Sequence, residues 1–220
     1  MALYKHRKMA EKNVEQVGDF DIFTDEKLGS GSFGSVYKGK HCTTGQNVVA
    51  KVITVTRENK EYVEGEIAIL KLGKRNKNIV KILFDELIGQ EMWIVMEECD
   101  LGNLAQYAMK NPMDLFTKIH IMHQCAQALV HLLNLKPQRV IHRDLKPANI
   151  LLMSGDGITA KLSDFGVSKR VSATATKLNT GAGSHHFMAP EMFDSNDEAM
   201  YNRAVDVFSL AVIIWYLLKV

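Results

Sequence analysis

The chain has no hydrophobic run long enough to cross a membrane and no cysteine pattern typical of a secreted or metal-binding protein. Its longest apolar run, Phe208 to Leu218, is too short to span a bilayer, so we expect a buried helix there. The basic start, residues 1–12, lacks the apolar segment of a signal peptide. Cys42, Cys99 and Cys125 show neither disulfide nor metal-ligand spacing, which indicates a reducing compartment and predicts a cytoplasmic protein.

The chain also lacks a strong excess of charge of either sign. Its 27 Lys and Arg residues against 25 Asp and Glu residues give a formal net charge of +2, which is no reason to expect binding to nucleic acid or to an anionic membrane. Hydrophobic residues make up 46% and charged residues 24% of the 220 positions. These values are ordinary for a soluble globular protein with one domain or two lobes.

Polar groups of three kinds are concentrated in the second half of the chain. The run from His142 to Asn149 places a carboxylate (Asp144), an ammonium (Lys146) and a carboxamide (Asn149) on one loop, and Asp164 opens a later Asp-Phe-Gly turn. Phosphoryl transfer from a metal-bound nucleotide needs such a set, because it requires a group that orients the hydroxyl, a cation for the phosphate charge and oxygen ligands for Mg²⁺. The run therefore predicts phosphoryl-transfer chemistry.

A glycine-rich segment in the first half, Gly29 to Val36, lies between two stretches that read as strands, residues 21–28 and 36–40. Its three glycines allow the backbone to approach phosphate closely. Such a segment alone is weak evidence, since Gly/Ser turns are common in hairpins. A valine after the last glycine, and a strand rather than a helix after that, distinguish it from a Rossmann motif and favour a lid over nucleotide phosphates.

With this segment, the His142–Asn149 run, the Asp164 turn and Met188 to Glu191 in the same order, the chain resembles the eukaryotic protein kinases. Lys146 after Asp-Leu fits the serine/threonine type, and the residues around Met188 suggest its tyrosine-kinase-like branch. The resemblance implies an α+β fold with two lobes, the first rich in strands with one regulatory helix, the second mainly helical and cut short after its central helix. It divides the chain into a polar extension (1–19), an N-lobe (20–96), a hinge (97–103) and a partial C-lobe (104–220).

The resemblance also implies the role of each polar group in the second half. Asp144 would be the catalytic base, and Lys146 would neutralise charge on the transferring phosphate. Asn149 and Asp164 would hold Mg²⁺. Asp206, fourteen residues before the end of the chain, matches a helix carboxylate that bonds the backbone of the catalytic loop.

In the first half, Lys51 would bind the nucleotide phosphates and pair with Glu66 on a helix predicted over residues 61–72. Glu64, half a turn away, is the other possible partner of Lys51. The alternative for Glu64 is that it lies on a solvated face of the helix. The strand around Lys51 departs from the family, because Val49 stands where alanine is usual and Ala50 is one residue off. Either Val49 forms a bulkier roof over the adenine, or the strand carries a local irregularity.

The contacts that the resemblance implies for ATP come from the glycine-rich segment, the lysine strand, the hinge with Met96 at the gatekeeper position, and the floor of the adenine site. These residues are Leu28, Gly29, Ser30, Gly31, Ser32, Phe33, Gly34, Val36, Val49, Lys51, Met96, Glu97, Cys99, Asn103 and Leu151. Hinge residues would contribute their backbone groups, and Cys99 is expected to be a structural rather than a reactive thiol. A hydrophobic column of Leu70, Ile82, His142 and Phe165 would align the lobes.

The function implied is an ATP- and Mg²⁺-dependent protein kinase that phosphorylates serine or threonine of protein substrates. The alternative is a truncated kinase-like nucleotide-binding or interaction module with little turnover. We expect the apolar residues between Val212 and Leu218 to lack the cover that later helices give in the family, and a partner that covers this helix is one expectation.

Overall fold

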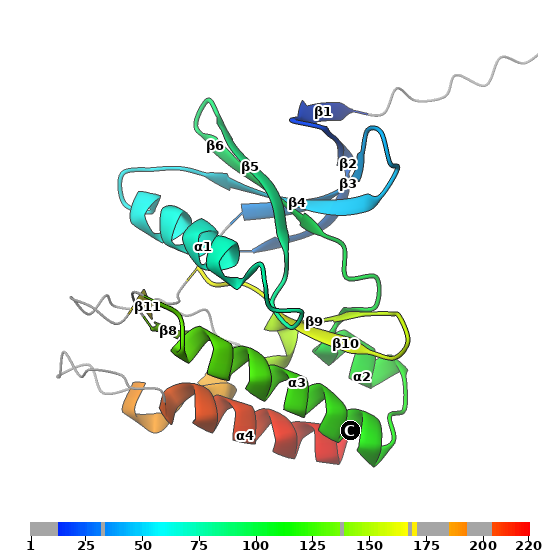
Figure 1. Cartoon of the computed structure of the whole chain (residues 1–220), viewed down its shortest axis with the longest axis vertical. Helices are drawn as coiled ribbons and strands as arrows, with labels where there is room; N and C mark the ends of the chain where they lie inside the picture. Colours follow the sequence, from blue (N-terminus) through cyan, green and yellow to red (C-terminus); the bar gives the residue numbers. More distant parts are fainter. Residues whose placement is uncertain (1–12, 32–33, 137–138, 167–168, 171–184, 193–203) are drawn as a thin grey trace, which may run out of the picture.

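The computed structural model describes residues 13–31, 34–136, 139–166, 169–170, 185–192 and 204–220. A six-stranded sheet with one helix forms one half of the molecule, and helices with short strands form the other half (Figure 1). The two-lobed α+β fold expected from the sequence is confirmed.

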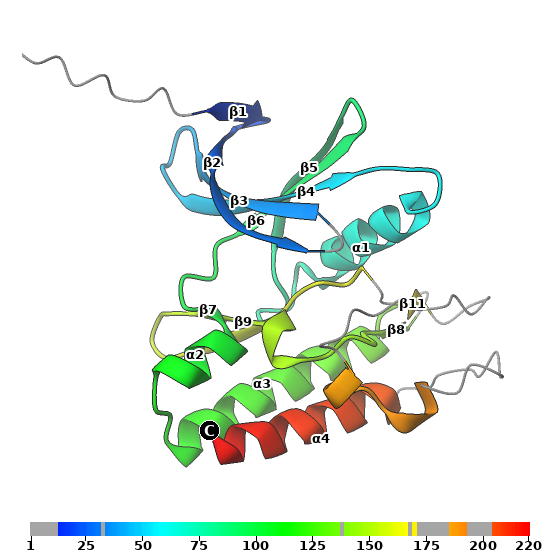
Figure 2. The same ribbon diagram turned by 180° about the vertical axis from the view of Figure 1, so that it is seen from behind.

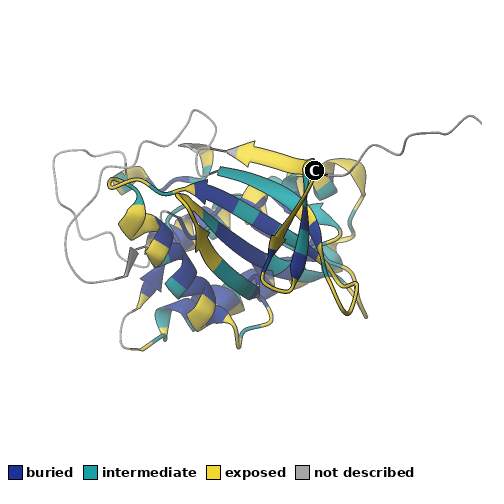
Figure 3. Cartoon of the chain, turned by 90° about the horizontal axis from the view of Figure 1, so that it is seen from above, coloured by how far each residue is buried: buried dark blue, intermediate teal, exposed yellow. Residues whose placement is uncertain are grey.

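The sheet of the first half is antiparallel throughout, in the order β1-β2-β3-β4-β6-β5. Its strands are β1 (Val14–Val17), β2 (Phe20–Gly31), β3 (Gly34–His41), β4 (Asn47–Thr54), β5 (Ile82–Ile88) and β6 (Glu91–Glu97). The tight turn between β5 and β6 contains Gly89 with a φ of 63°, a left-handed conformation that favours glycine. Buried residues predominate in the middle of the strands, and exposed ones at the hairpins (Figure 3).

The two faces of this sheet bury different side chains, as the two-residue period of a strand dictates. Val48, Ala50 and Val52 of β4 belong to an outer cluster that also contains Trp93. Ile53 belongs to the main core, which continues through helix α1 (Lys60–Gly73) into the second half of the molecule. The alternation in β4 therefore turns Val49 and Lys51 inward, toward the second half.

The second half is built on two helices that lie side by side, α3 (Leu115–Leu133) and α4 (Ala204–Lys219) (Figures 1 and 2). The Asp114 side chain caps α3 by accepting a hydrogen bond from the N–H of Thr117 at 2.7 Å. The remaining elements are β7 (Gly102–Asn103), α2 (Leu104–Lys110), β8 (Val140–Ile141), β9 (Ile150–Met153), β10 (Thr159–Leu162), β11 (Lys169–Arg170) and the 3₁₀ turns η1 (Pro147–Asn149), η2 (His185–Phe187) and η3 (Pro190–Met192).

Strand β5 begins later than its local sequence suggests. The run from Asn78 to Ile82 reads as the start of a strand, but β5 begins only at Ile82. The preceding residues pair with the second half instead, because the N–H of Val80 donates to the carbonyl of Leu162 at 3.0 Å and Ile79 forms a parallel bridge with Leu162. This segment is therefore a junction between the two halves.

Two residues of helix α4 that were expected to be uncovered are buried instead. Ile213 and Leu217 are fully buried, because these positions lie one turn apart on the face that packs on α3. Ile214, Trp215 and Leu218 are exposed, as expected. Within the described ranges, no helix has both the length and the apolar character that a membrane span requires.

Candidate active site

A cavity of about 520 Å³ lies between the sheet and the second half of the molecule, within the usual size range of small-molecule sites. Residues from β2, β3, β4, the segment after β6, β9 and the Asp-Phe-Gly turn line it together. Those expected from the sequence to contact a nucleotide and found in its lining are Leu28, Gly29, Val36, Val49, Lys51, Met96, Cys99, Asn103 and Leu151.

The lining of the cavity does not include every residue expected to contact a nucleotide. Ser30, Gly34 and Glu97 are not among the described residues that line the cavity. Ser32 and Phe33 fall outside the described residues, and Gly31 ends β2 beside them. Close packing requires a glycine at position 34, since a Cβ added there would lie 2.0 Å from the carbonyl oxygen of Val52.

Several lining residues were not expected from the sequence as nucleotide contacts, among them Lys38, Val80, Asp100 and Gln106. Lys38 could have been found, because the two-residue period of β3 places it on the same face as Val36. Val80 and Asp100 carry no such signal, since their positions depend on loops that join distant elements.

The lysine strand is regular, which decides between the two interpretations of Val49. β4 pairs with β3 and β6 without a register shift. Val49 lines the cavity, whereas Ala50 is buried in the outer cluster on the other face. The strand irregularity is excluded, and valine takes the place of the smaller residue in the cavity wall.

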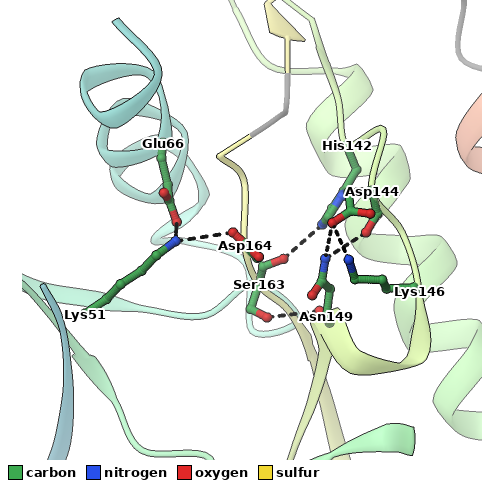
Figure 4. A network of polar contacts seen from close by, with 8 residues as sticks. All are labelled: Lys51, Glu66, His142, Asp144, Lys146, Asn149, Ser163 and Asp164. Atoms are coloured by element: carbon green, nitrogen blue, oxygen red, sulfur yellow. Dashed lines mark hydrogen bonds and ion pairs between the residues drawn. The ribbon is translucent and has the colours of Figure 1, made fainter. Parts of the chain in front are cut away.

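Lys51 lies between two carboxylates. Its Nζ is 2.6 Å from Oε1 of Glu66 and 3.2 Å from Oδ1 of Asp164 (Figure 4). Burial lowers the pKa of Lys51, but the charges of Glu66 and Asp164 outweigh that effect and raise it. Glu64, the rival partner, is 61% exposed and lies 3.8 Å from Lys60. The structure therefore pairs Lys51 with Glu66.

The loop around Asp144 forms a second polar group, on the far side of Asp164 from Lys51 (Figure 4). The Nζ of Lys146 donates to Oδ2 of Asp144 at 2.7 Å. Nδ2 of Asn149 donates to the backbone carbonyl of Asp144 at 2.8 Å and to its Oδ2 at 3.0 Å. Ser163 joins this loop to the Asp164 turn, since its hydroxyl donates to the carbonyl of Asn149 at 3.0 Å.

Helix α4 holds the start of this loop through Asp206. The carboxylate accepts the N–H of His142 at 2.8 Å and the N–H of Arg143 at 2.9 Å, which confirms the bond expected from the sequence. Arg143 and Asp164 have φ values of 68° and 60°, a left-handed conformation that costs non-glycine residues about 1–3 kcal/mol. Such strained residues persist only where surrounding contacts fix them, and they cluster at functional sites.

The hydrophobic column expected from the sequence is assembled. The rings of His142 and Phe165 lie 5.0 Å apart between centroids, and Phe165 is almost fully buried. Leu70 and Ile82 belong to the same core cluster as Phe165. The column joins α1, the sheet and the Asp-Phe-Gly turn, so the two polar groups are supported from one packed core.

The oxygen atoms around Asp164 suit a hard divalent cation. Both hydrogen bonds of the Asn149 amide use its nitrogen, which leaves the amide oxygen as its available ligand atom. Among the described residues, no three His, Cys, Asp or Glu side chains form a metal cluster. Mg²⁺ needs no such cluster, because it is usually held by one or two carboxylates and keeps waters and substrate phosphates as further ligands.

Cys99 lines the cavity as an unreactive thiol. Burial, together with the charge of Glu97, raises its pKa to about 12. Since the thiolate is the reactive form, a thiol with this pKa is protonated at neutral pH. The expectation of a structural cysteine agrees with this environment.

Comparisons with known proteins agree with this geometry. The chain matches the family described as "Protein kinase domain" over residues 23–220. It is 34% identical over 207 residues to Misshapen-like kinase 1 of Rattus norvegicus, 37% over 188 residues to Serine/threonine-protein kinase 1 of Arabidopsis thaliana, and 36% over 188 residues to Serine/threonine-protein kinase PAK 1 of Mus musculus.

These alignments cover 90%, 84% and 85% of the chain, respectively. The chain spans 15%, 22% and 33% of the lengths of these relatives. The family match covers most of the chain and includes both polar groups of the cavity. The chain therefore belongs to the protein kinase domain family, and within it to the serine/threonine type.

Proposed function

We propose that the chain transfers the γ-phosphate of ATP to serine or threonine hydroxyls of protein substrates. The observation that carries this proposal is the arrangement of two polar groups along one cavity. Lys51 with Glu66 forms one group, and Asp144 with Lys146 forms the other. Asp164 lies between them and bonds Lys51.

The contacts of each polar group support a distinct role in phosphoryl transfer. Glu66 holds the ammonium of Lys51 in the cavity, where it can bind nucleotide phosphates. Asp144 orients the substrate hydroxyl and accepts its proton, as the hydroxyl oxygen bonds to the γ-phosphorus and the bond from that phosphorus to the β,γ-bridging oxygen breaks. Lys146, already bonded to Asp144, is placed to neutralise phosphate charge.

Asn149 and Asp164 are the residues that would hold Mg²⁺, through one amide oxygen and one carboxylate. When bound, the metal supplies positive charge that offsets the charge developing on the phosphate oxygens. The chain itself supplies position: Ser163 bonds the backbone of Asn149, and Lys51 bonds Asp164. Positioning and electrostatic stabilisation account for most of the rate in phosphoryl transfer.

A reducing, cytoplasmic location belongs to the same proposal. All three cysteines are free thiols, and Cys42 is exposed. Free exposed thiols are ordinary in compartments that keep cysteine reduced. The proposed macromolecular partner is the protein substrate itself.

The test is transfer of labelled phosphate from Mg-ATP to a generic protein substrate such as casein. We expect transfer by the parent chain and only background transfer by Asp164→Asn, because removal of this carboxylate charge weakens the hold on the metal. Asp156→Asn makes the same chemical change at an exposed position between β9 and β10 and should behave as the parent does.

A different result would favour the nucleotide-binding or interaction module. In that case ATP would raise the melting temperature of the parent, but neither the parent nor Asp156→Asn would transfer phosphate. Equal transfer by the parent and Asp164→Asn would contradict the proposed role of Asp164 and point to a contaminating kinase.

A further inference from the structure

The hinge between the two halves of the molecule is fastened to the β9–β10 hairpin at its first residue, Glu97. Oε1 of Glu97 lies 2.8 Å from Nζ of Lys161 on β10, and it also accepts the N–H of Lys81 at 2.8 Å. The Lys161 side chain is only 7% exposed and donates to the carbonyl of Lys77 at 2.8 Å. Removing charges from water to this extent is costly, so the pair persists only because its hydrogen bonds are satisfied.

The same hairpin holds the hinge a second time, three residues later. The carboxylate of Asp100 accepts the N–H of Ser154 at 2.8 Å and its hydroxyl at 2.5 Å. These hydrogen bonds lower the pKa of Asp100, which means that they favour the ionised carboxylate. The N–H of Leu101 next in the chain donates to the carbonyl of Leu152 on β9 at 3.1 Å.

The residues between the two attachments face the candidate nucleotide cavity. Glu98 and Cys99 both line it, and neither side chain belongs to the two attachments. The hairpin itself continues from Lys161 to Asp164, three residues further on, which lines the same cavity. One hairpin thus contacts the hinge on one side of the cavity and leads into the Asp-Phe-Gly turn on the other.

We propose that these four side chains, Glu97 with Lys161 and Asp100 with Ser154, act as a hinge clamp. The clamp fixes the backbone of residues 97–100 relative to Asp164 and so sets the affinity of the cavity for a nucleotide. Lys161 and Ser154 are positioning residues, since they act through the hinge and do not line the cavity. The consequence for affinity rests on the proposed function, whereas the restraint on the hinge does not.

The first test measures amide hydrogen exchange in residues 97–103 of the protein without nucleotide. Lys161→Met should speed exchange in this segment, because local opening becomes easier when an anchoring contact is lost. Ser154→Ala should speed it less, since the backbone N–H of residue 154 still bonds Asp100 after the hydroxyl is removed. Lys60→Met is the matched control for the lysine change, since Lys60 is exposed and 3.8 Å from Glu64, and it should leave the hinge unchanged. Lys161→Arg keeps the cation and should restore slow exchange.

A second variant guards against loss of folding in Lys161→Met, which leaves the Glu97 carboxylate without its cation. Glu97→Gln retains an oxygen acceptor for the N–H of Lys81, and the double variant Glu97→Gln with Lys161→Met leaves no unpaired charge. We expect the double variant to melt near the parent temperature while its hinge still exchanges faster. Parent-like exchange in a folded double variant would overturn the clamp.

The second test measures the dissociation constant of a fluorescent ATP analogue, together with KM and kcat where transfer occurs. Lys161→Met should weaken binding and raise KM several-fold while kcat stays within about twofold, because only the nucleotide-holding surface shifts. Ser154→Ala should act in the same direction by a smaller factor, since one of its two bonds to Asp100 remains. Unchanged affinity despite a faster-exchanging hinge would overturn the role in nucleotide binding, and tighter binding would mean that the contacts restrain the hinge in a less competent position, which also overturns it.

Different results contradict the proposed function and the hinge clamp. A parent chain that binds the analogue but transfers no phosphate contradicts the proposed function, and the dissociation constants still decide the role of the clamp. A parent chain that binds no analogue contradicts both the proposed function and the effect on affinity. In every case the exchange rates decide whether the four side chains restrain the hinge.

Discussion

Lys51 is held by two carboxylates of different burial. Glu66 is 3% exposed, whereas Asp164 is 31% exposed and opens toward the cavity. Burial raises the pKa of Glu66, and the charge of Lys51 opposes that effect. The charge of Lys51 compensates the charge of the buried Glu66 carboxylate. Glu66 in turn holds Lys51 in position, and Asp164 remains accessible from the cavity.

At the scale of one residue we predict that Glu66→Gln lowers kcat by about tenfold or more, since mispositioning of a charged group at a phosphoryl-transfer site is costly in rate. Glu64→Gln is the matched control, with the same chemical change two residues away on the exposed face of α1. Steady-state kinetics of both variants measure the difference. Equal rates for the two variants would contradict the role of Glu66.

Side chains of the two polar groups were predictable from the sequence because they lie in short runs of fixed spacing. Lys51, Asp144, Asn149 and Asp164 all fall into such runs, and their neighbours constrain where they point. Lys161 was not predictable, since it stands between two buried residues of β10 and reads as an ordinary solvated lysine. Its partner Glu97 is 64 residues away, and only tertiary packing brings them together.

At the scale of elements, the first turn of α4 supports the loop that carries Asp144. Asp206 is buried and accepts two backbone N–H groups from residues that precede Asp144. One of those residues, Arg143, has left-handed torsions that need such support. The helix therefore acts on the site without lining the cavity.

We predict that Asp206→Ala destabilises the fold by about 3 kcal/mol, because each buried donor left unsatisfied costs about 1–3 kcal/mol. Activity should fall further than stability accounts for, since the loop that carries Asp144 loses its anchor. Denaturant unfolding and kinetics at a temperature where the variant is folded measure the two effects. Val207→Ala, at an exposed position of the same helix, should change neither; a similar loss in both variants would contradict the anchor.

Elements were predictable where their period is strong and local. The apolar spacing places the helix predicted over residues 61–72 within one residue of both ends of α1. The start of β5 was not predictable, because Ile79 and Val80 are as suitable for a strand as Ile82 is. Their pairing with Leu162 is decided by the docking of the second half, a contact that no local window contains.

At the scale of the whole molecule, apolar side chains remain exposed on neighbouring faces of α3 and α4. They border a groove of about 310 Å³ between the two helices. Of the residues that line it, Ile119, Ile214 and Leu218 are exposed. Contiguous apolar surface of this kind drives association, because burying it removes it from water.

We predict that the chain self-associates reversibly in a concentration-dependent way, through this groove. Sedimentation velocity across a range of concentrations should show the average mass rising, and Ile214→Lys with Leu218→Lys should abolish the rise. Leu87→Lys with Ile88→Lys adds the same charges at exposed apolar residues of the β5–β6 hairpin and should leave association intact. A monomer at all concentrations, or equal loss in both double variants, would contradict the prediction.

The spacing of contacts along the chain has a consequence for how the protein is made. Every strand of the six-stranded sheet lies between Val14 and Glu97, so this sheet can pair while later residues are still being synthesised. The contact of Lys51 with Asp164 spans 113 residues and must wait. Until then the inner face of the sheet has no partner to cover it, so slowing translation between residues 97 and 162 would prolong the exposure of this apolar face in the nascent chain.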